Sequence, residues 1–230
     1  MKFRRWAEWT QLGLVAAMFL AGSLAWTSAP DRIPIHWGAD GTVDRYGGKL
    51  EGLLGLPAFA LLLYLLLRYM PRIDPGRANY QSFVGAYAWF RTAIIGFFAA
   101  LYGVVLYVTF GGSVNMSQLM PHVLGVFLII IGPLMGKIRP NWFIGIRTPW
   151  TLSSKIAWVR THRLGGWLFT ALGVAFILAT SIFGPSSLKI LLVAIVGLVV
   201  TLAVYSWFVW KDDPEKVAPA DTAPAGGDQD

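Results

Sequence analysis

The feature that most constrains this chain is a series of six long apolar segments with almost no charged residues. An α-helix needs about 20 apolar residues to cross the hydrocarbon core of a bilayer, and the segments are too long and uniformly apolar for strands. They cover residues 9–29, 52–67, 92–110, 118–135, 164–183 and 188–210. The second is the shortest, and it spans the bilayer only if Arg68 reaches the interface. The sequence predicts an all-α, polytopic transmembrane helix bundle of about six helices.

Composition supports a membrane protein and narrows its possible partners. Charged residues make up 13% of the chain, against about 25% in soluble domains. A net charge of +7 would suggest nucleic acid in a soluble protein, but here the basic residues lie between apolar segments, where they set orientation. We therefore expect membrane lipid as a partner and no direct nucleic-acid binding. The chain has no cysteine, which excludes disulfides, thiolate catalysis and cysteine-based metal sites.

The basic residues predict the orientation in the membrane. Cytoplasmic loops carry the excess of Lys and Arg. With the N-terminus inside, 15 of the 19 basic residues are cytoplasmic, including Arg91 just before the third segment. The four outside are Arg32, Arg45, Lys49 and Lys189. Both ends are therefore expected in the cytoplasm.

The first segment allows two interpretations. Its basic start and its small residues at 21–25 are typical of a cleaved signal peptide, but signal peptides have shorter apolar regions of about 7–15 residues. We favour an uncleaved membrane anchor. Either interpretation leaves the orientation of the other five helices unchanged.

The segments expected outside the membrane divide the chain into three parts. Residues 1–75 form a transmembrane hairpin with an extracytoplasmic loop at 30–51, whose glycines and aspartates predict repeated turns. Residues 76–210 form a second transmembrane region with a basic cytoplasmic loop at 136–163. Residues 211–230 are rich in Asp, Ala, Pro and Gly, and we expect them to be disordered.

The cytoplasmic loop carries the most specific motif in the chain. Its ordered signature comprises Pro140, Asn141, Phe143, Gly145, Arg147, Thr148, Pro149, Trp150, Thr151, Trp158, Thr161, His162 and Gly166. This signature resembles that of the SdpI-like immunity protein family, strongly over residues 132–167. One departure is Gly132-Pro133, where the family commonly has Gly-Asn. That departure removes a polar side chain near the inner end of the fourth helix.

The outer loop carries a second, shorter motif. It consists of Pro34, His36, Trp37, Gly38, Gly41, Asp44, Tyr46, Gly47, Gly48 and Lys49. Over about residues 29–67 the chain is similar to a domain of unknown function that often precedes the SdpI-like region. This similarity supports the family resemblance without indicating an activity.

The resemblance implies a multi-pass protein of the bacterial cytoplasmic membrane that protects its host against a secreted antimicrobial peptide toxin. It also implies possible capture of a cytoplasmic transcriptional repressor. We expect no enzyme activity, catalytic residues, cofactor or metal. The residues expected to bind a partner are Asn141, Gly145, Arg147, Thr148, Pro149, Trp150, Thr151, Trp158 and His162.

The residue types in this loop and their spacing allow two interpretations. Thr148-Pro149 is typical of a helix start, with Ser153 or Ser154 as an alternative cap. The spacing of Ser154, Trp158 and His162 places them on one face of a helix expected along the inner membrane surface. The loop is either a Trp-anchored topology signal or a site for an anionic or peptidic partner. In the second case, Asn141, Arg147 and His162 would converge.

Two further patterns bear on function. His36 lies near Asp31, Asp40 and Asp44, but their spacing matches no metal signature, and turn formation explains the aspartates. The middles of the six segments carry no Asp, Glu, Lys or Arg, whereas ion-coupled transporters need such groups. The alternative function is a transporter or enzyme for an anionic lipid or small molecule at the inner interface. A deep polar cavity at Asn141, Arg147 and His162 would favour it, and tight packing would favour a binding protein.

Overall fold

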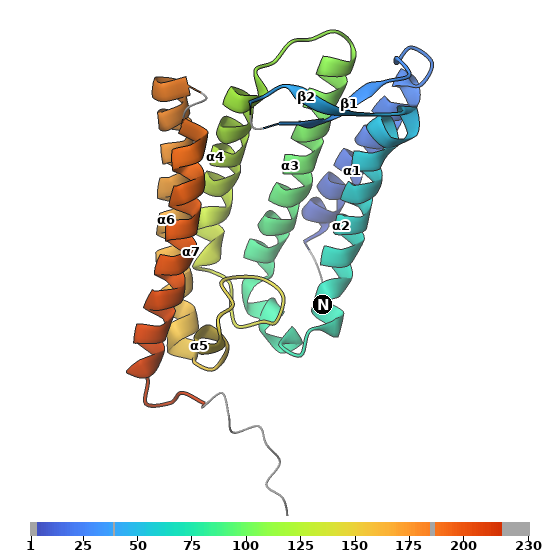
Figure 1. The fold of residues 1–230 in the computed structure, drawn as a ribbon. Helices are drawn as coiled ribbons and strands as arrows, with labels where there is room; N and C mark the ends of the chain where they lie inside the picture. The colour runs from blue at the N-terminus through green and yellow to red at the C-terminus, as the bar shows by residue number, and fades with distance from the viewer. Residues whose placement is uncertain (1–3, 39, 185–186, 218–230) are drawn as a thin grey trace, which may run out of the picture.

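The long helices form one bundle, with a β-hairpin at one end and the loop at 136–154 at the other (Figure 1). The computed structural model describes residues 4–38, 40–184 and 187–217. The helices are α1 (Arg5–Ala25), α2 (Gly55–Ile73), α3 (Val84–Thr109), α4 (Met116–Met135), α5 (Pro149–Leu152), α6 (Lys155–Phe183) and α7 (Ser187–Lys211). The start of α1 and the end of α7 lie at the same end as this loop, here called the motif end. The opposite end is called the hairpin end.

Five of the helices within the described residues are long and apolar enough to cross a membrane. The prediction of an all-α membrane bundle is confirmed. The first predicted segment corresponds to α1, whose 21 residues fall outside this set because they include Glu8 and Gln11. The second segment, apolar over 52–67, lies within a longer helical stretch that runs from Leu50 to Ile73, 24 residues.

The α4 and α6 helices pack with their backbones in close approach. A Cβ atom on Gly132 would lie 2.8 Å from the Gly166 carbonyl oxygen, and one on Gly173 would lie 2.5 Å from that of Gly125. Each helix has its two glycines seven residues apart, which is two helical turns on the same face. Small residues of this kind let membrane helices pack tightly where lipid provides no hydrophobic driving force.

Three clusters of buried apolar residues follow one another along the bundle. The cluster at the motif end joins α2, α3 and α4 to the loop through Ile138 and Ile144, and to α6 through Trp158. The middle cluster joins α1, α2 and α3, and the third packs Ile33 of the hairpin against the outer ends of the helices. The motif loop is therefore part of the packed bundle.

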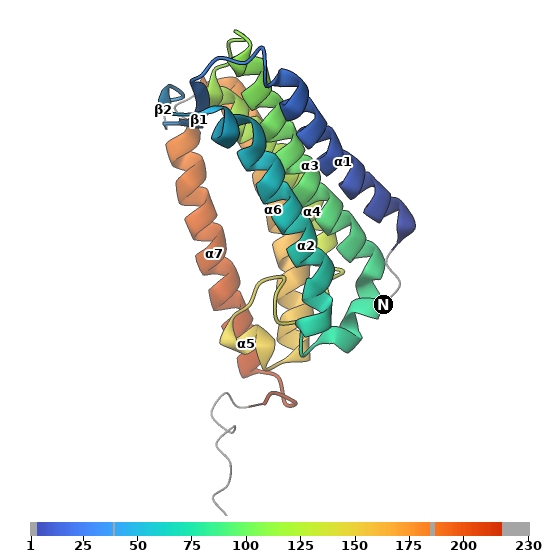
Figure 2. The same ribbon diagram turned by 90° about the vertical axis from the view of Figure 1, so that its right-hand side faces the viewer.

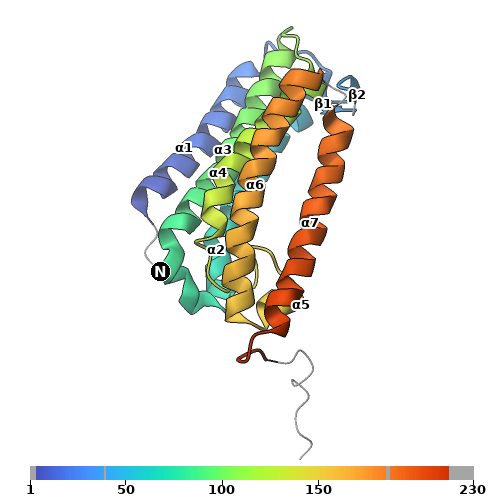
Figure 3. The ribbon, with the colours of Figure 1, turned by 90° about the vertical axis from the view of Figure 1, so that its left-hand side faces the viewer.

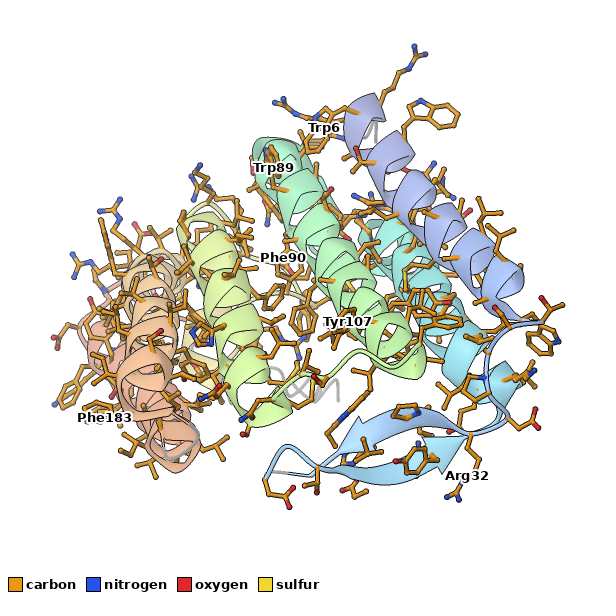
Figure 4. The ribbon with its side chains drawn as sticks, turned by 90° about the horizontal axis from the view of Figure 1, so that it is seen from above. Trp6, Arg32, Trp89, Phe90, Tyr107 and Phe183 are labelled. Atoms are coloured by element: carbon orange, nitrogen blue, oxygen red, sulfur yellow. The ribbon has the colours of Figure 1, made fainter. Side chains whose placement is uncertain are left out.

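The outer loop forms an antiparallel hairpin of β1 (Ile33–Trp37) and β2 (Val43–Gly47). Figure 4 looks down on this end and shows the hairpin lying beside the helix ends. Turns were predicted here, but the two strands were missed. Short strands interrupted by register shifts leave little alternating pattern in the sequence.

Two predicted boundaries need correction at the motif end. The loop expected at 136–163 ends at Ser154, and the rest belongs to α6, a single helix of 29 residues. Residues 154–163 were expected to form a separate short helix along the membrane surface. They form instead the cap and the first turns of the continuous helix α6. The tail expected to be disordered from 211 is ordered through Val217, and the remainder, 218–230, lies outside the described residues.

The arrangement gives a direct test of orientation. We expect reporter fusions after Gly112 and after Gly184 to be external and a fusion after Arg147 to be cytoplasmic, since basic residues concentrate at the motif end. Paired alkaline phosphatase and fluorescent-protein fusions would measure this. A cytoplasmic signal at Gly184 would contradict the predicted orientation.

Candidate functional site

Asn141 organises the motif loop, residues 136–154, from inside. Its side chain is 2% exposed. The amide oxygen accepts hydrogen bonds from the backbone N–H groups of Phe143 (3.0 Å) and Ile144 (2.7 Å). The amide nitrogen donates to the carbonyls of Arg139 (2.9 Å) and Ile144 (3.0 Å). One side chain thus satisfies four backbone groups of an irregular segment.

Trp158 and His162 tie the loop to α6. Both are fully buried, and their rings stack with centroids 4.1 Å apart. The N–H of Ile146 donates to His162 Nε2 (2.9 Å), so Nδ1 carries the proton that is donated to the Trp158 carbonyl (2.8 Å). Trp158 Nε1 donates to the Ile138 carbonyl (2.9 Å). Both ring nitrogens of His162 are therefore used in holding the structure.

Gly145 is required by the loop geometry for two reasons. Its φ of +120° lies in the region that L side chains rarely adopt. A Cβ atom there would also overlap His162 Nε2, well inside van der Waals contact. The predicted binding role of Gly145 is thus accompanied by a clear structural one.

The predicted cap at Thr148 is confirmed. Its hydroxyl accepts from Thr151 N (3.1 Å), and the Thr151 hydroxyl accepts from Thr148 N (2.9 Å), which forms a capping box at the start of α5. The Thr148 hydroxyl also lies 2.9 Å from that of Ser206, which links the loop to α7. The side views show α5 beside the end of α7 (Figures 2 and 3). Ser154, the alternative cap, starts α6 by accepting from Ala157 N (2.9 Å).

The connection between α2 and α3 supports the loop from the other side, which sequence reasoning missed. The buried carboxylate of Asp74 accepts from Trp142 N (3.1 Å) and from the Tyr80 hydroxyl (2.8 Å). Asn79 Nδ2 donates to the Pro140 carbonyl (2.7 Å). The signal available in the sequence is the turn Asp74-Pro75-Gly76 between two apolar segments. Contact between that turn and a loop more than 60 residues away requires the tertiary structure.

The outward face of the loop combines aromatic and basic side chains. Trp142 is 57% exposed and Phe143 is 40% exposed. Arg147 is exposed, and its guanidinium donates to the Trp142 carbonyl. Beside them lies a cavity of about 600 Å³, lined in part by Trp142, Leu152, Ile156 and Val217. This face is available to a partner, whereas the inward face is occupied by packing.

The predicted motif residues therefore divide into two groups. Asn141, Thr151, Trp158 and His162 are buried, and Gly145 is fixed by His162. Arg147 and Pro149 are exposed, and Thr148 and Trp150 are half-buried. Asn141, Arg147 and His162 all bind the backbone of the short stretch 141–147, but their polar groups are used on that backbone rather than gathered around a ligand.

The described part of the C-terminal segment is fastened to the motif loop. Asp213 is 3% exposed, and its carboxylate accepts hydrogen bonds from the Ser154 hydroxyl and from Glu215 N (2.9 Å). The bond from Ser154 contributes most to lowering the pKa of Asp213 below its ordinary value of 3.8. Val217 N donates to the Ser153 carbonyl (3.0 Å). Residues after α7 thus help to hold the start of α6.

We expect Asp213→Ala to lower the thermal stability of the purified protein, because it removes the acceptor at Ser154. The lowered pKa means that this contribution is present above pH 3.8 and is lost as the pH falls through the folded-state value. Differential scanning fluorimetry would measure it. The matched control is Asp212→Ala, which changes the exposed neighbour. Equal melting temperatures for the two variants would show that the hydrogen bond between Asp213 and Ser154 does not stabilise the protein.

Deleting 218–230 should leave accumulation in the membrane unchanged.

The outer-loop motif residues shape the hairpin. Pro34, His36 and Trp37 lie on β1, Gly41 lies in its turn, Asp44 and Gly47 lie on β2, and Lys49 follows it. His36 Nδ1 is 2.6 Å from Asp44 Oδ1, in an exposed pair across the strands. Lys49 Nζ donates to the Trp26 carbonyl (3.2 Å). Within the described ranges no group of three potential metal-ligating side chains is present.

A buried ion-pair cluster joins α1, α2 and α3 near the motif end. Arg91 was placed in a cytoplasmic segment, but it is 1% exposed inside α3 and pairs with Glu8 of α1 (2.8 Å). Glu8 also pairs with Arg68 of α2 (3.3 Å) and accepts from the Tyr64 hydroxyl (2.9 Å). At the same end, Trp6 of α1 lies against Trp89 of α3 (Figure 4). Sequence reasoning missed the cluster because its members flank the apolar segments.

Fold and site together define a multi-pass helical membrane protein with an ordered motif loop at one end and a β-hairpin at the other. Residues 137–208 match the SdpI/YfhL protein family, and residues 13–61 match a domain of unknown function, DUF1648. The chain is also similar to the immunity protein SdpI of Bacillus subtilis (strain 168), with 27% identity over 205 residues. That alignment covers 85% of this chain and 92% of the relative. The family resemblance predicted from the motifs is thus confirmed, and no solved structure matches.

Proposed function

We propose that this protein is a bacterial cytoplasmic-membrane immunity protein that protects its host against a secreted antimicrobial peptide. The observation that carries the proposal is the similarity to an immunity protein along most of both chains. A similarity confined to the motif would support only a shared loop. Here both the hairpin region and the motif region match known families.

We further propose that the motif loop binds a cytoplasmic partner, for which a transcriptional repressor is the candidate implied by the family. Two features support a protein partner. The loop backbone is held rigid by Asn141, Asp74 and His162, which lowers the entropy cost of binding. Its outward face presents Trp142 and Arg147, and these residue types are enriched in protein interfaces.

The alternative, an enzyme or transporter at the inner interface, needs a polar cavity at the motif residues. The 600 Å³ cavity beside the loop and a second one of about 500 Å³ at Arg163 do not include Asn141, Arg147 or His162 in their linings. Packing around Asn141 and His162 is tight. By this criterion the binding protein is favoured.

The decisive experiment is expression of the chain in a bacterium sensitive to a family-type peptide toxin. Survival is scored at matched membrane levels. Cells carrying the protein should survive a toxin concentration that kills cells carrying an empty vector. Equal killing would overturn the immunity proposal for that toxin class.

The exposed Arg147 tests the binding role of the loop. We expect Arg147→Ala to reduce repressor-dependent signalling about tenfold or more, since a charged hydrogen bond contributes about 1.5–3 kcal/mol. Arg147→Lys should restore only part, because Lys lacks the planar fork. A reporter assay on membranes with equal protein levels would measure this.

Arg160→Ala is the matched control, since Arg160 is also exposed at the motif end. It should be nearly silent, because many other basic residues maintain the orientation. If Arg147→Ala and Arg160→Ala behave alike, the loop is a topology anchor rather than a binding site.

A further inference from the structure

A small cavity at the motif end opens onto the buried ion pairs. It holds about 390 Å³ and is lined by Arg5, Glu8, Trp9, Leu12, Tyr64 and Arg68. It lies between the first turns of α1 and the last turns of α2, away from the motif loop residues. The function proposed above uses none of its lining residues.

The charges around this cavity favour an anion. Arg5 and Arg68 line it, and Arg91 lies behind Glu8, so three arginines surround one carboxylate. Both oxygens of Glu8 are engaged, Oε1 by Arg91 and Oε2 by Arg68 and Tyr64. The negative charge of Glu8 is therefore already balanced by its ion pairs with Arg91 and Arg68. Positive charge in excess of negative charge is costly near the low-dielectric core, and a bound anion offsets it.

The rim of the cavity is apolar on the side of α1 that faces outward. Trp9 is 73% exposed and Leu12 is 37% exposed on successive turns of that helix. Exposed Trp at a helix end is typical of the level of the lipid headgroups. An anion with an attached hydrocarbon chain fits both parts of the site: its charge meets Arg5 and Arg68, and its chain continues along Leu12.

We propose that this cavity binds the phosphate group of an anionic phospholipid from the cytoplasmic leaflet. Guanidinium groups match phosphate oxygens in geometry and charge. The bound lipid links α1 to α2 at the point where Glu8 joins both to α3. The bound lipid thus adds contacts to α1, the long helix that falls outside the set apolar enough to cross a membrane. This proposal is independent of the immunity function.

The chain offers a closely matched pair of variants. Arg5 and Arg4 are adjacent, both exposed and equally charged. Arg5 lines the cavity, whereas the Arg4 guanidinium lies near Gly85 of α3. Any general effect of positive charge on lipid attraction or orientation is therefore the same in Arg5→Gln and Arg4→Gln.

The test is lipid binding to the purified full chain in detergent, counted by native mass spectrometry. The probes are palmitoyl-oleoyl phosphatidylglycerol and phosphatidylcholine of the same acyl chains. Phosphatidylglycerol should bind more tightly, and Arg5→Gln should weaken it about tenfold, as expected for one charged hydrogen bond. Arg4→Gln should stay within about twofold, since it removes only long-range attraction.

Three results would overturn the proposal. Equal binding of the two lipids would remove its selectivity for anions. Equal weakening by Arg5→Gln and Arg4→Gln would show diffuse charge attraction rather than a site. Displacement of the lipid by millimolar inorganic phosphate would identify a free anion, rather than a lipid, as the ligand. Retention of bound lipid under that competition supports the lipid assignment.

Discussion

Replacing Glu8 by glutamine is expected to cost about 3–5 kcal/mol of folding free energy, the usual penalty for breaking a buried ion pair from one side. The change keeps the shape of the side chain. It removes the negative charge that faces Arg91, which is 1% exposed, and Arg68. It also turns an amide N–H₂ group toward donors that need an acceptor. Denaturation of the purified protein in mixed micelles would measure the loss.

Glu51→Gln is the matched control for this variant. Glu51 pairs with Arg45 at 3.2 Å, but both side chains are more than half exposed. Exposed pairs contribute only about 0–1 kcal/mol. Combining Glu8→Gln with Arg91→Leu should recover part of the stability, because the double variant also removes the buried charge that Glu8 balances. Equal stability of Glu8→Gln and Glu51→Gln would show that the cluster does not support the fold.

Replacing Gly145 by alanine is expected to disorder the motif loop while the helices remain inserted. The backbone strain costs about 1–3 kcal/mol at such a φ. The new methyl group also displaces His162 Nε2 from Ile146 N, which leaves a half-buried N–H unsatisfied, at a cost of about 1 kcal/mol. Trypsin should then cut faster at Lys137 and Arg147 in inside-out vesicles, and protection should be lost at normal membrane levels.

Gly197→Ala provides the control, because a Cβ atom there meets nothing within 4 Å. Alanine is the better helix former by about 1 kcal/mol, so this variant should match or slightly exceed the original stability. If Gly145→Ala shows the same trypsin rate as Gly197→Ala, the loop tolerates a side chain at 145. In that case the close contact with His162 does not determine its shape.

These variants separate two roles that the motif combines. Its buried members build a rigid loop, as Asn141 does through four backbone hydrogen bonds. Its exposed members, Arg147 above all, are the ones that can touch a partner. A defect caused by the first group is visible as proteolysis or unfolding. A change at the exposed Arg147 removes one hydrogen bond, to the Trp142 carbonyl, and should leave the rest of the loop in place.

The sequence by itself determined the class of fold, because unbroken apolar length is a local property that a bilayer selects directly. It also predicted the cap at Thr148, with Ser153 or Ser154 as the alternative, because the hydrogen bonds of a cap lie within a few residues along the chain. The motif itself was visible in the order of residues from Pro140 to His162.

Only the tertiary structure decided what the polar residues do. Glu8 and Arg91 are 83 residues apart and form a buried pair because α1 packs against α3. Asp74 reaches Trp142 across 68 residues, and Asp213 reaches Ser154 across 59. Hydrophobic periodicity carries no information on such pairs, because a charged residue at the edge of an apolar segment looks the same whether it faces water or another helix. Packing of neighbouring helices makes that choice, since it determines which edges lose their water and must pair.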